Sequence, residues 1–214
     1  MMQTISEDIT LHDLTAKFGL MQTEDEQFFR EWQDNLPEVT EHEKRSLNRI
    51  KSNYNNLIAY PPLLENAVKM VVLSPLLDLA GFYQPPLRIE TETSVNLVSE
   101  DEGVLVKGRI DVLVLNQRLW ILVIESKKAE FSLEAARAQA LTYMLASPNG
   151  DKPIFGLITN GSSFIFLKLV KQNSPLYSLS RVFSLLSPGN ELYNVLAILK
   201  QLGSIVAIAH DLES

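Results

Sequence analysis

Three charged side chains in the middle of the chain have the types and the spacing of a metal-dependent hydrolytic site. Asp111 and Glu125 lie fourteen residues apart, and Lys127 follows two residues later. Two carboxylates supply the hard oxygen ligands that Mg²⁺ prefers, and they leave positions for water and for a phosphate. The metal lowers the pKa of water and neutralises charge on the phosphate, and a nearby ammonium can stabilise that charge. The set therefore suits cleavage of phosphodiester bonds.

The elements that must position these residues are two strands. Apolar and polar residues alternate from Val104 to Val114, and Leu119 to Glu125 is an almost wholly apolar run that is typical of a central strand. Only residues 116–118 separate the two runs, which predicts an antiparallel hairpin. If the hairpin is centred on this link, Asp111 and Glu125 lie directly opposite each other with Cβ atoms about 5 Å apart.

Strand alternation returns Lys127 to the face that carries Glu125. A second interpretation stays open, because single acidic residues at strand ends are usually only solvated. Against it, Glu125 ends a run of apolar residues, and a carboxylate buried beside a core strand is unfavourable unless it is paired or bound to a metal.

The sixty residues at the N-terminus have a polar, helical pattern. Thr23 and Thr40 each begin an S/T-x-x-E capping box, and the second predicts a helix over residues 41–59. Pro61-Pro62 ends that helix, and a more apolar helix follows up to about Leu73. Ser74-Pro75 then predicts the cap and first turn of another short helix.

The part of the chain after the hairpin alternates between helix and strand patterns. Ser132 predicts the N-cap of a helix over residues 133–146. Strands over 153–159 and 163–170 flank Asn160-Gly161, which is a strong hairpin signal. A final helix over 189–209 has one apolar face. The order predicts an α+β fold, an α/β sandwich in which helices flank a mixed β-sheet. We expect residues 1–60 to form a helical N-terminal arm and residues 61–214 to form the domain that holds the site.

The hydrolytic residues also resemble a known signature. Asp111, with Glu125 and Lys127 in Glu-Ser-Lys, resembles the PD-(D/E)xK nuclease superfamily, although Ile110 stands where proline is usual. The resemblance covers roughly residues 61–170 and implies a restriction-endonuclease-like core.

Two further motifs narrow this resemblance to one branch of the superfamily. Gln139 and Tyr143 resemble its Q-x-x-x-Y motif, and residues 159–166 resemble a hairpin of the same branch. That branch contains recombination nucleases and the N-terminal nuclease domain of type I restriction-enzyme R subunits. The first sixty residues match neither motif, and no helicase motor follows in the sequence.

The resemblance implies roles for three residues outside the strands. Gln139 and Tyr143 are four residues apart and so share a helix face, and the resemblance implies that they act near the phosphate backbone and the catalytic lysine. Glu65 lies where such nucleases often add an acidic metal ligand to Asp111 and Glu125. The alternatives are a polar helix face with a half-buried tyrosine, and a surface glutamate.

Basic residues that lie near these motifs are candidates for contacts with substrate phosphates. They are Arg109, Lys128 and Arg137. Arg137 precedes Gln139 by two residues and therefore points to a different side of the helix. Charged residues on strand and helix faces are most often simply solvated, and that interpretation stays open for all three.

Composition limits the classes of function. The chain has 214 residues, a net charge of −7, 46% hydrophobic residues and no cysteine. The absence of cysteine excludes disulfides, thiol catalysis and zinc–thiolate sites. An acidic chain cannot grip nucleic acid with its whole surface, so phosphate contacts must be local or come from a partner. No secretory signal or bilayer-spanning run is apparent, and we expect a soluble cytoplasmic protein that has no membrane contact.

Two classes of function follow. The first is a Mg²⁺-dependent deoxyribonuclease, with Mn²⁺ as a substitute, which resembles the type I restriction R subunit but lacks a helicase motor. The second is a catalytically silent module that has the nuclease fold and binds nucleic acid or a protein partner; RNA as the substrate also stays open. Because the apolar stripes of the N-terminal helices are narrow and need partners, we also predict a homo-oligomer through these helices.

Overall fold

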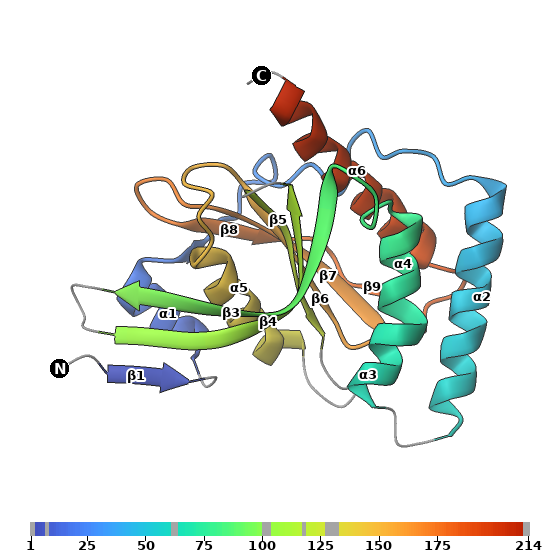
Figure 1. Cartoon of the computed structure of the whole chain (residues 1–214), viewed down its shortest axis with the longest axis horizontal. Coiled ribbons are helices and arrows are strands. Elements are labelled where there is room, and N and C mark those ends of the chain that lie inside the picture. Colours follow the sequence, from blue (N-terminus) through green and yellow to red (C-terminus); the bar gives the residue numbers. More distant parts are fainter. Residues whose placement is uncertain are drawn as a thin grey trace.

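Among the residues that the structure describes, nine strands form one mixed sheet in the middle of the computed structural model (Figure 1). The described residues are 3–6, 9–60, 64–99, 104–116, 119–126 and 133–211. The strands are β1 (Gln3–Ser6), β2 (Met21–Gln22), β3 (Leu87–Ser99), β4 (Val104–Asn116), β5 (Leu119–Ser126), β6 (Ile154–Thr159), β7 (Ser163–Val170), β8 (Leu176–Leu179) and β9 (Phe183–Ser184).

Helical segments cover both faces of this sheet. They are α1 (Leu11–Phe18), α2 (Glu41–Ile58), α3 (Glu65–Val68), the π-helical turn η1 (Lys69–Leu73), α4 (Ser74–Leu79), α5 (Leu133–Leu145) and α6 (Leu192–Asp211). In Figure 1, α1 and α5 lie on one side of the sheet, and α2, α3, α4 and α6 lie on the other. We call these the α5 side and the α4 side. The predicted α+β class, with a mixed sheet between helices, is confirmed.

The main path of the sheet runs β1-β4-β5-β6-β7-β8-β2, with β3 paired to β4 and β9 paired to β7. The pairs β3–β4, β4–β5, β6–β7 and β7–β8 are antiparallel, whereas β5 and β6 are parallel. Helix α5 makes the crossover between β5 and β6, as a parallel pair requires. Both predicted hairpins, β4–β5 and β6–β7, are confirmed.

Two separate apolar cores hold the layers together. Side chains from α2, α4 and α6 pack on the α4 side against one set of strand residues that includes Val112, Val114 and Ile124. On the α5 side, α1 and α5 pack against Ile110, Leu113 and other strand residues. The central strands are therefore buried on both faces, which explains the nearly continuous apolar runs in their sequences.

The sequence pattern predicted a helical N-terminal region of sixty residues, but the structure shows that this region is only partly helical. Strand β1 pairs in parallel with β4, and β2 pairs in parallel with β8. The Thr23 capping box does not begin a helix, because the Thr23 hydroxyl instead accepts a hydrogen bond from the Asp25 amide in a turn. The Thr40 box does begin α2, as predicted, with the reciprocal bonds between Thr40 and Glu43 present.

Helix α2 buries its narrow apolar stripe within its own chain. Leu47, Ile50 and Tyr54 are buried in the core on the α4 side. The need for an outside partner, which led us to predict an oligomer through these helices, is therefore met by intramolecular packing. The oligomer and the division of the chain at residue 60 remain predictions. Among the described residues, no helix is long and apolar enough to cross a bilayer.

The hairpin between β6 and β7 packs its turn tightly against helices on the α4 side. Asn160 accepts hydrogen bonds from the amides of Ser162 and Ser163, and Gly161 has a φ of +88°. A Cβ atom on Gly161 would lie 2.7 Å from Cγ1 of Val68. Glycine is required here both for its backbone angle and for the close approach of the helix.

We expect Gly161→Ala to lower the free energy of unfolding by about 2–4 kcal/mol, since the left-handed angle and the contact with Val68 are both unfavourable for alanine. Urea denaturation would measure the loss. Gly150→Ala is the matched control, because Gly150 has a φ of +61° but has open space around its Cα. The control should lose only about 1 kcal/mol, and equal losses in the two variants would contradict the packing argument.

Candidate active site

Asp111 lies where β3 and β4 bend together and exchange faces. Ile110 packs in the core on the α5 side, but Val112 packs in the core on the α4 side. Simple alternation would place these two residues on the same face. The single alternating run predicted from Val104 to Val114 is therefore wrong, since the phase shifts at Asp111. On β3, the neighbouring Glu92 has a φ of +55°, which marks the same irregularity.

The consequence of this bend is that two adjacent residues of each strand face one cavity. Asp111 and Val112 line it from β4, and Thr91 and Glu92 line it from β3. Figure 1 shows both strands changing direction sharply near the helices α3 and α4. A regular strand would have sent one residue of each pair into the opposite core.

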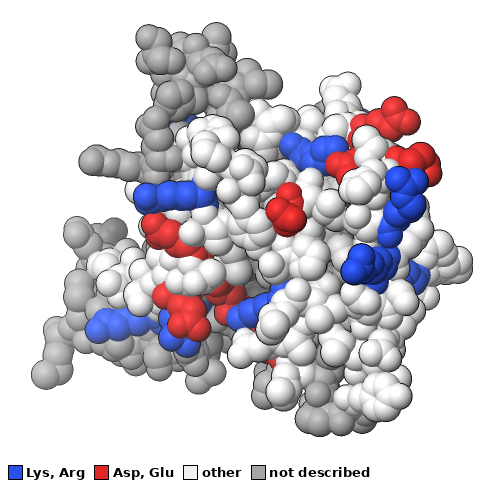
Figure 2. Space-filling view, turned by 45° about the vertical axis from the view of Figure 1, so that its right-hand side comes forward, with Lys and Arg blue, Asp and Glu red and all other residues white. Residues whose placement is uncertain are grey.

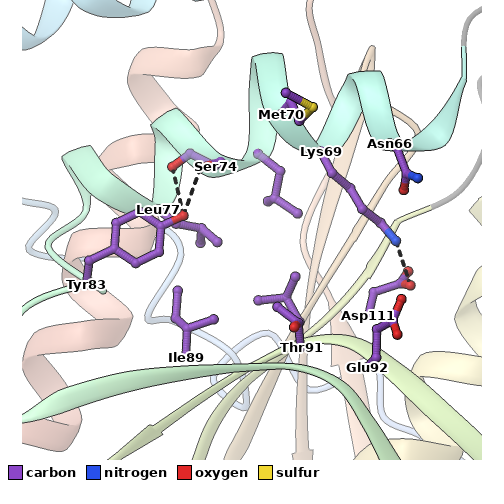
Figure 3. Close-up of a pocket in the computed structure, with 12 residues that line it drawn as sticks. Asn66, Lys69, Met70, Ser74, Leu77, Tyr83, Ile89, Thr91, Glu92 and Asp111 are labelled. Carbon is purple, nitrogen blue, oxygen red and sulfur yellow. Dashed lines mark hydrogen bonds and ion pairs between the residues drawn. The ribbon is translucent and has the colours of Figure 1, made fainter.

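The cavity beside Asp111 has a volume of about 460 Å³ and two chemically different ends (Figure 3). Asp111, Glu92 and Lys69 form a polar end. The other end is apolar, with walls that include Leu77, Tyr83 and Ile89. Tyr83 is 44% exposed, and its hydroxyl lies 2.9 Å from Oγ of Ser74.

The helical segment above the cavity changes its winding at Lys69. The sequence predicted a helix end near Leu73 and a new cap at Ser74, but the structure has a continuous helical segment with a π-turn over Lys69–Leu73. Pro75 has no amide to donate to Val71, and its ring crowds that carbonyl, so the regular ladder cannot continue. The amide of Ser74 donates instead to the carbonyl of Lys69.

The ammonium of Lys69 bridges two carboxylates from different elements. Its Nζ lies 2.7 Å from Oε1 of Glu65 on α3 and 2.8 Å from Oδ1 of Asp111 on β4. Figure 3 shows the Lys69 side chain pointing from its helix toward Asp111. Burial alone would lower the pKa of Lys69, but the hydrogen bonds to Asp111 and Glu65 outweigh burial, and the pKa is raised above its ordinary value.

This bridge shows that Glu65 and Asp111 fit a cation, because a positive charge already lies between them. Oxygen donors of this kind also suit Mg²⁺ or Mn²⁺. Among the residues whose side chains are described, no group of three or more acidic or histidine side chains is placed to hold a metal. The side chain of Glu125 lies outside that set, so the predicted ligand group of Asp111, Glu125 and Glu65 stays a prediction.

The backbone brings Glu125 to the expected place in the sheet. Val112 pairs with Ile124 across β4 and β5, so Asp111 and Glu125 each stand one residue beyond the same pair. This is the register that the sequence predicted, although it is reached through a bulge between Val114 and Leu115. Lys127 and Lys128 follow β5 and lie outside the described residues.

Gln139 and Tyr143 join α5 to β4 close to Asp111. Nε2 of Gln139 donates to Oη of Tyr143 over 2.6 Å, and the Arg109 amide donates to the same oxygen over 3.2 Å. Tyr143 is 2% exposed, and a Cβ atom on Gly108 would collide with its ring. The pair therefore anchors the strand that leads to Asp111 from the α5 side, and its expected role at a phosphate stays a prediction.

The two described arginine candidates lie in different environments. Arg109 has an exposed side chain, and its guanidinium lies 3.5 Å from Oε2 of Glu92 beside the cavity. Arg137 instead lies near Tyr177. Burial, the larger effect, raises the pKa of the Tyr177 phenol, and the positive charge of Arg137 lowers it. Nε of Arg137 is buried without a hydrogen-bond partner among the described residues. The structure thus brings Arg109, but not Arg137, toward the cavity.

Lys69 is the residue of this site that the sequence argument missed. The sequence does contain a signal for it, because Lys69 follows Glu65 by four residues and so shares its helix face.

Figure 2 shows Lys and Arg side chains interspersed with Asp and Glu on the face turned toward the viewer, and no broad basic surface covers the part of the chain described there. Positive charge at this site is therefore local.

A layered fold in which Lys69 bridges Glu65 and Asp111 at the bend of the central strands is consistent with a nuclease-type domain. The family model "Type I restriction enzyme R protein N terminus (HSDR_N)" matches residues 21–174. The chain belongs to this family, and the resemblance found in its sequence is confirmed.

The other two comparisons add little. A solved structure of a phage-related exonuclease from Haemophilus somnus 129PT aligns with 12% identity over 98% of this chain and 97% of that chain. Its TM-score is 0.24, which is too low to support an argument about fold or activity. No curated protein matches the chain.

The link between α5 and β4 can be tested by stability. We expect Tyr143→Phe to lower the free energy of unfolding by about 1–3 kcal/mol, because it removes the partner of the Gln139 amide and of a backbone amide. Gln139→Leu combined with Tyr143→Phe should lose less than the sum of the two single losses, since both remove one shared bond.

Chemical denaturation of the two single variants and the double variant would measure this coupling. Tyr193→Phe is the control, because the Tyr193 hydroxyl donates to Asn48 at an exposed position and its loss should change stability by less than about 0.5 kcal/mol. Strictly additive losses for Gln139 and Tyr143 would refute the shared anchor.

Proposed function

We propose that this protein is a metal-dependent nuclease that hydrolyses phosphodiester bonds in DNA. The observation that carries the proposal is the position of Asp111 at the polar end of a cavity, where its carboxylate already binds a cationic group. Membership of the restriction R-subunit family supports the same class of reaction.

In this proposal each residue of the site has a separate task. Asp111 and Glu125 would hold Mg²⁺, or Mn²⁺ in its place, and Glu65 on α3, whose carboxylate contacts the same ammonium as Asp111, would be a third ligand. When bound, such an ion lowers the pKa of water and neutralises charge on the phosphate. Lys127 stabilises the negative charge that develops on the phosphate during attack. Gln139 and Tyr143 hold β4, and with it Asp111, in position.

The cavity also supplies surface for the rest of the substrate. Arg109 at its rim, together with Lys128, would meet phosphates near the cleaved bond. Tyr83 presents a half-exposed ring at the apolar end, and the bond to Ser74 holds that ring in place. A preorganised aromatic ring is a suitable stacking partner for a base.

The observation of Lys69 between the carboxylates also favours a second candidate, a catalytically silent module that binds DNA, RNA or a protein. A lysine that permanently replaced the metal would leave the fold intact without chemistry. The net charge of −7 agrees with weak binding of nucleic acid by the chain alone. Cleavage assays separate the two candidates.

In the decisive assay, purified protein is incubated with plasmid and with single-stranded DNA, with Mg²⁺, Mn²⁺ or EDTA. We expect cleavage that requires the metal and that falls by at least about a hundredfold in Asp111→Ala and in Glu125→Ala, because each variant loses a ligand of the ion. Gel electrophoresis and a fluorescent end-labelled strand would measure the rates. A matched control is Glu191→Ala. It removes a carboxylate that also pairs with a basic residue, Arg181, but that does not line the cavity. Wild-type protein that cuts nothing would leave the silent module as the function.

The contribution of the apolar end can be tested by binding. We expect Tyr83→Ala to weaken binding of single-stranded DNA by roughly 5- to 100-fold, since one aromatic stacking partner contributes about 1–3 kcal/mol. Fluorescence anisotropy in Ca²⁺, a larger hard cation that takes oxygen ligands, would measure the affinity. Tyr60→Ala is the control, because Tyr60 is 76% exposed and does not line the cavity. Equal effects of the two substitutions would refute a stacking role for Tyr83.

A further inference from the structure

Lys69 lies between the carboxylates of Glu65 and Asp111, two of the three proposed metal ligands. Its ammonium lies within 3 Å of one oxygen each from Glu65 and Asp111, and these two carboxylates come from separate elements. Without a cation between them, two carboxylates this close would repel each other across a partly buried space. Lys69 therefore keeps Asp111 in place in the protein without a metal.

In this position, Lys69 would compete with any divalent cation that binds Asp111. A metal ion that bound Asp111 through Oδ1 would compete with the ammonium of Lys69, which contacts the same oxygen. A metal ion and an ammonium that contact one carboxylate oxygen repel each other strongly, since the partly buried site screens their charges less than water does. A metal ion and the ammonium could not both contact Oδ1 of Asp111 at their closest distance.

The structure gives Lys69 a way to release Asp111 without becoming unpaired. The Glu65–Lys69 pair lies within one continuous helical segment with a spacing of four residues, so it can persist when the contact with β4 breaks. The lysine stem is long and flexible, and the cavity of about 460 Å³ lies directly beside it. Its side chain is also partly exposed, so movement does not require opening of a core.

We propose that Lys69 is an internal counter-cation that competes with the divalent metal for Asp111. Without the metal, Lys69 holds Asp111; when the metal binds, Lys69 releases Asp111 and stays on Oε1 of Glu65, which leaves the second oxygen of Glu65 for the metal. Lys69 is thus a positioning residue that sets the metal concentration at which the site is filled. This inference rests on the proposed metal-dependent function, because it assigns a residue to the control of that same site.

The test measures binding of Mn²⁺ by calorimetry, without nucleic acid, to the wild-type chain and to Lys69→Met. We expect Lys69→Met to bind Mn²⁺ at least about tenfold more tightly, since the competing charge is gone. Lys69→Gln keeps a group that can donate to Asp111 without charge and should bind more tightly in the same way, which guards against a folding defect specific to methionine. Lys17→Met is the matched control, because Lys17 also pairs with an acidic residue four positions earlier, Asp13, and its loss changes the net charge equally.

Thermal unfolding gives a second readout that does not depend on activity. Without metal, Lys69→Met should melt below the wild type, and saturating Mn²⁺ should raise its melting temperature by more than it raises that of the wild type. Mn²⁺ affinity in Lys69→Met and Lys69→Gln that is unchanged or weaker than in the wild type would overturn the competition. Absence of Mn²⁺ binding in every variant, wild type included, would instead overturn the proposed metal-dependent function itself, and the inference with it.

Discussion

The shared bend of β3 and β4 is the feature on which the rest of the site depends. A regular strand sends alternate side chains to opposite faces, so a continuous β4 could not have turned both Asp111 and Val112 toward the same cavity. The phase shift lets Ile110 and Leu113 fill the core on the α5 side while Asp111 and Val112 both face the α4 side. The acidic group thus reaches a cavity while the strand that carries it stays buried on both sides.

Support for this bend comes from both layers of helices. On the α5 side, the Tyr143 ring covers Gly108, and its hydroxyl accepts from the amide of Arg109, two residues before Asp111. On the α4 side, the ammonium of Lys69 bonds to Asp111 itself. A carboxylate that must meet a cation in a fixed geometry benefits from a backbone that cannot drift. The Q-x-x-x-Y pair therefore matters to the site through the position of β4 even though its tyrosine is buried.

Local signals in the sequence predicted the elements, and contacts between distant segments decided the details. The short link at 116–118 predicted the β4–β5 hairpin, because a short connection leaves few alternatives. The register of Asp111 with Glu125 depends also on the bulge between Val114 and Leu115, since Asn116 pairs with Leu119 at the turn. The bend was not predictable, since a left-handed angle at Glu92 is unusual for a residue with a side chain. Strand β2 was missed for a similar reason: two residues carry no period, and only pairing with β8 makes them a strand.

The winding of the helix explains how Lys69 comes to contact Asp111. Pro75 removes a donor from the helix, the π-turn that results begins at Lys69, and a residue that reads as an ordinary helix lysine comes to lie on a carboxylate of the central sheet. In an acidic protein, such a local positive charge solves the problem of holding two carboxylates together before a metal binds. Under the proposed metal-dependent function, the affinity of the site for the metal would be set by competition between the metal and this ammonium.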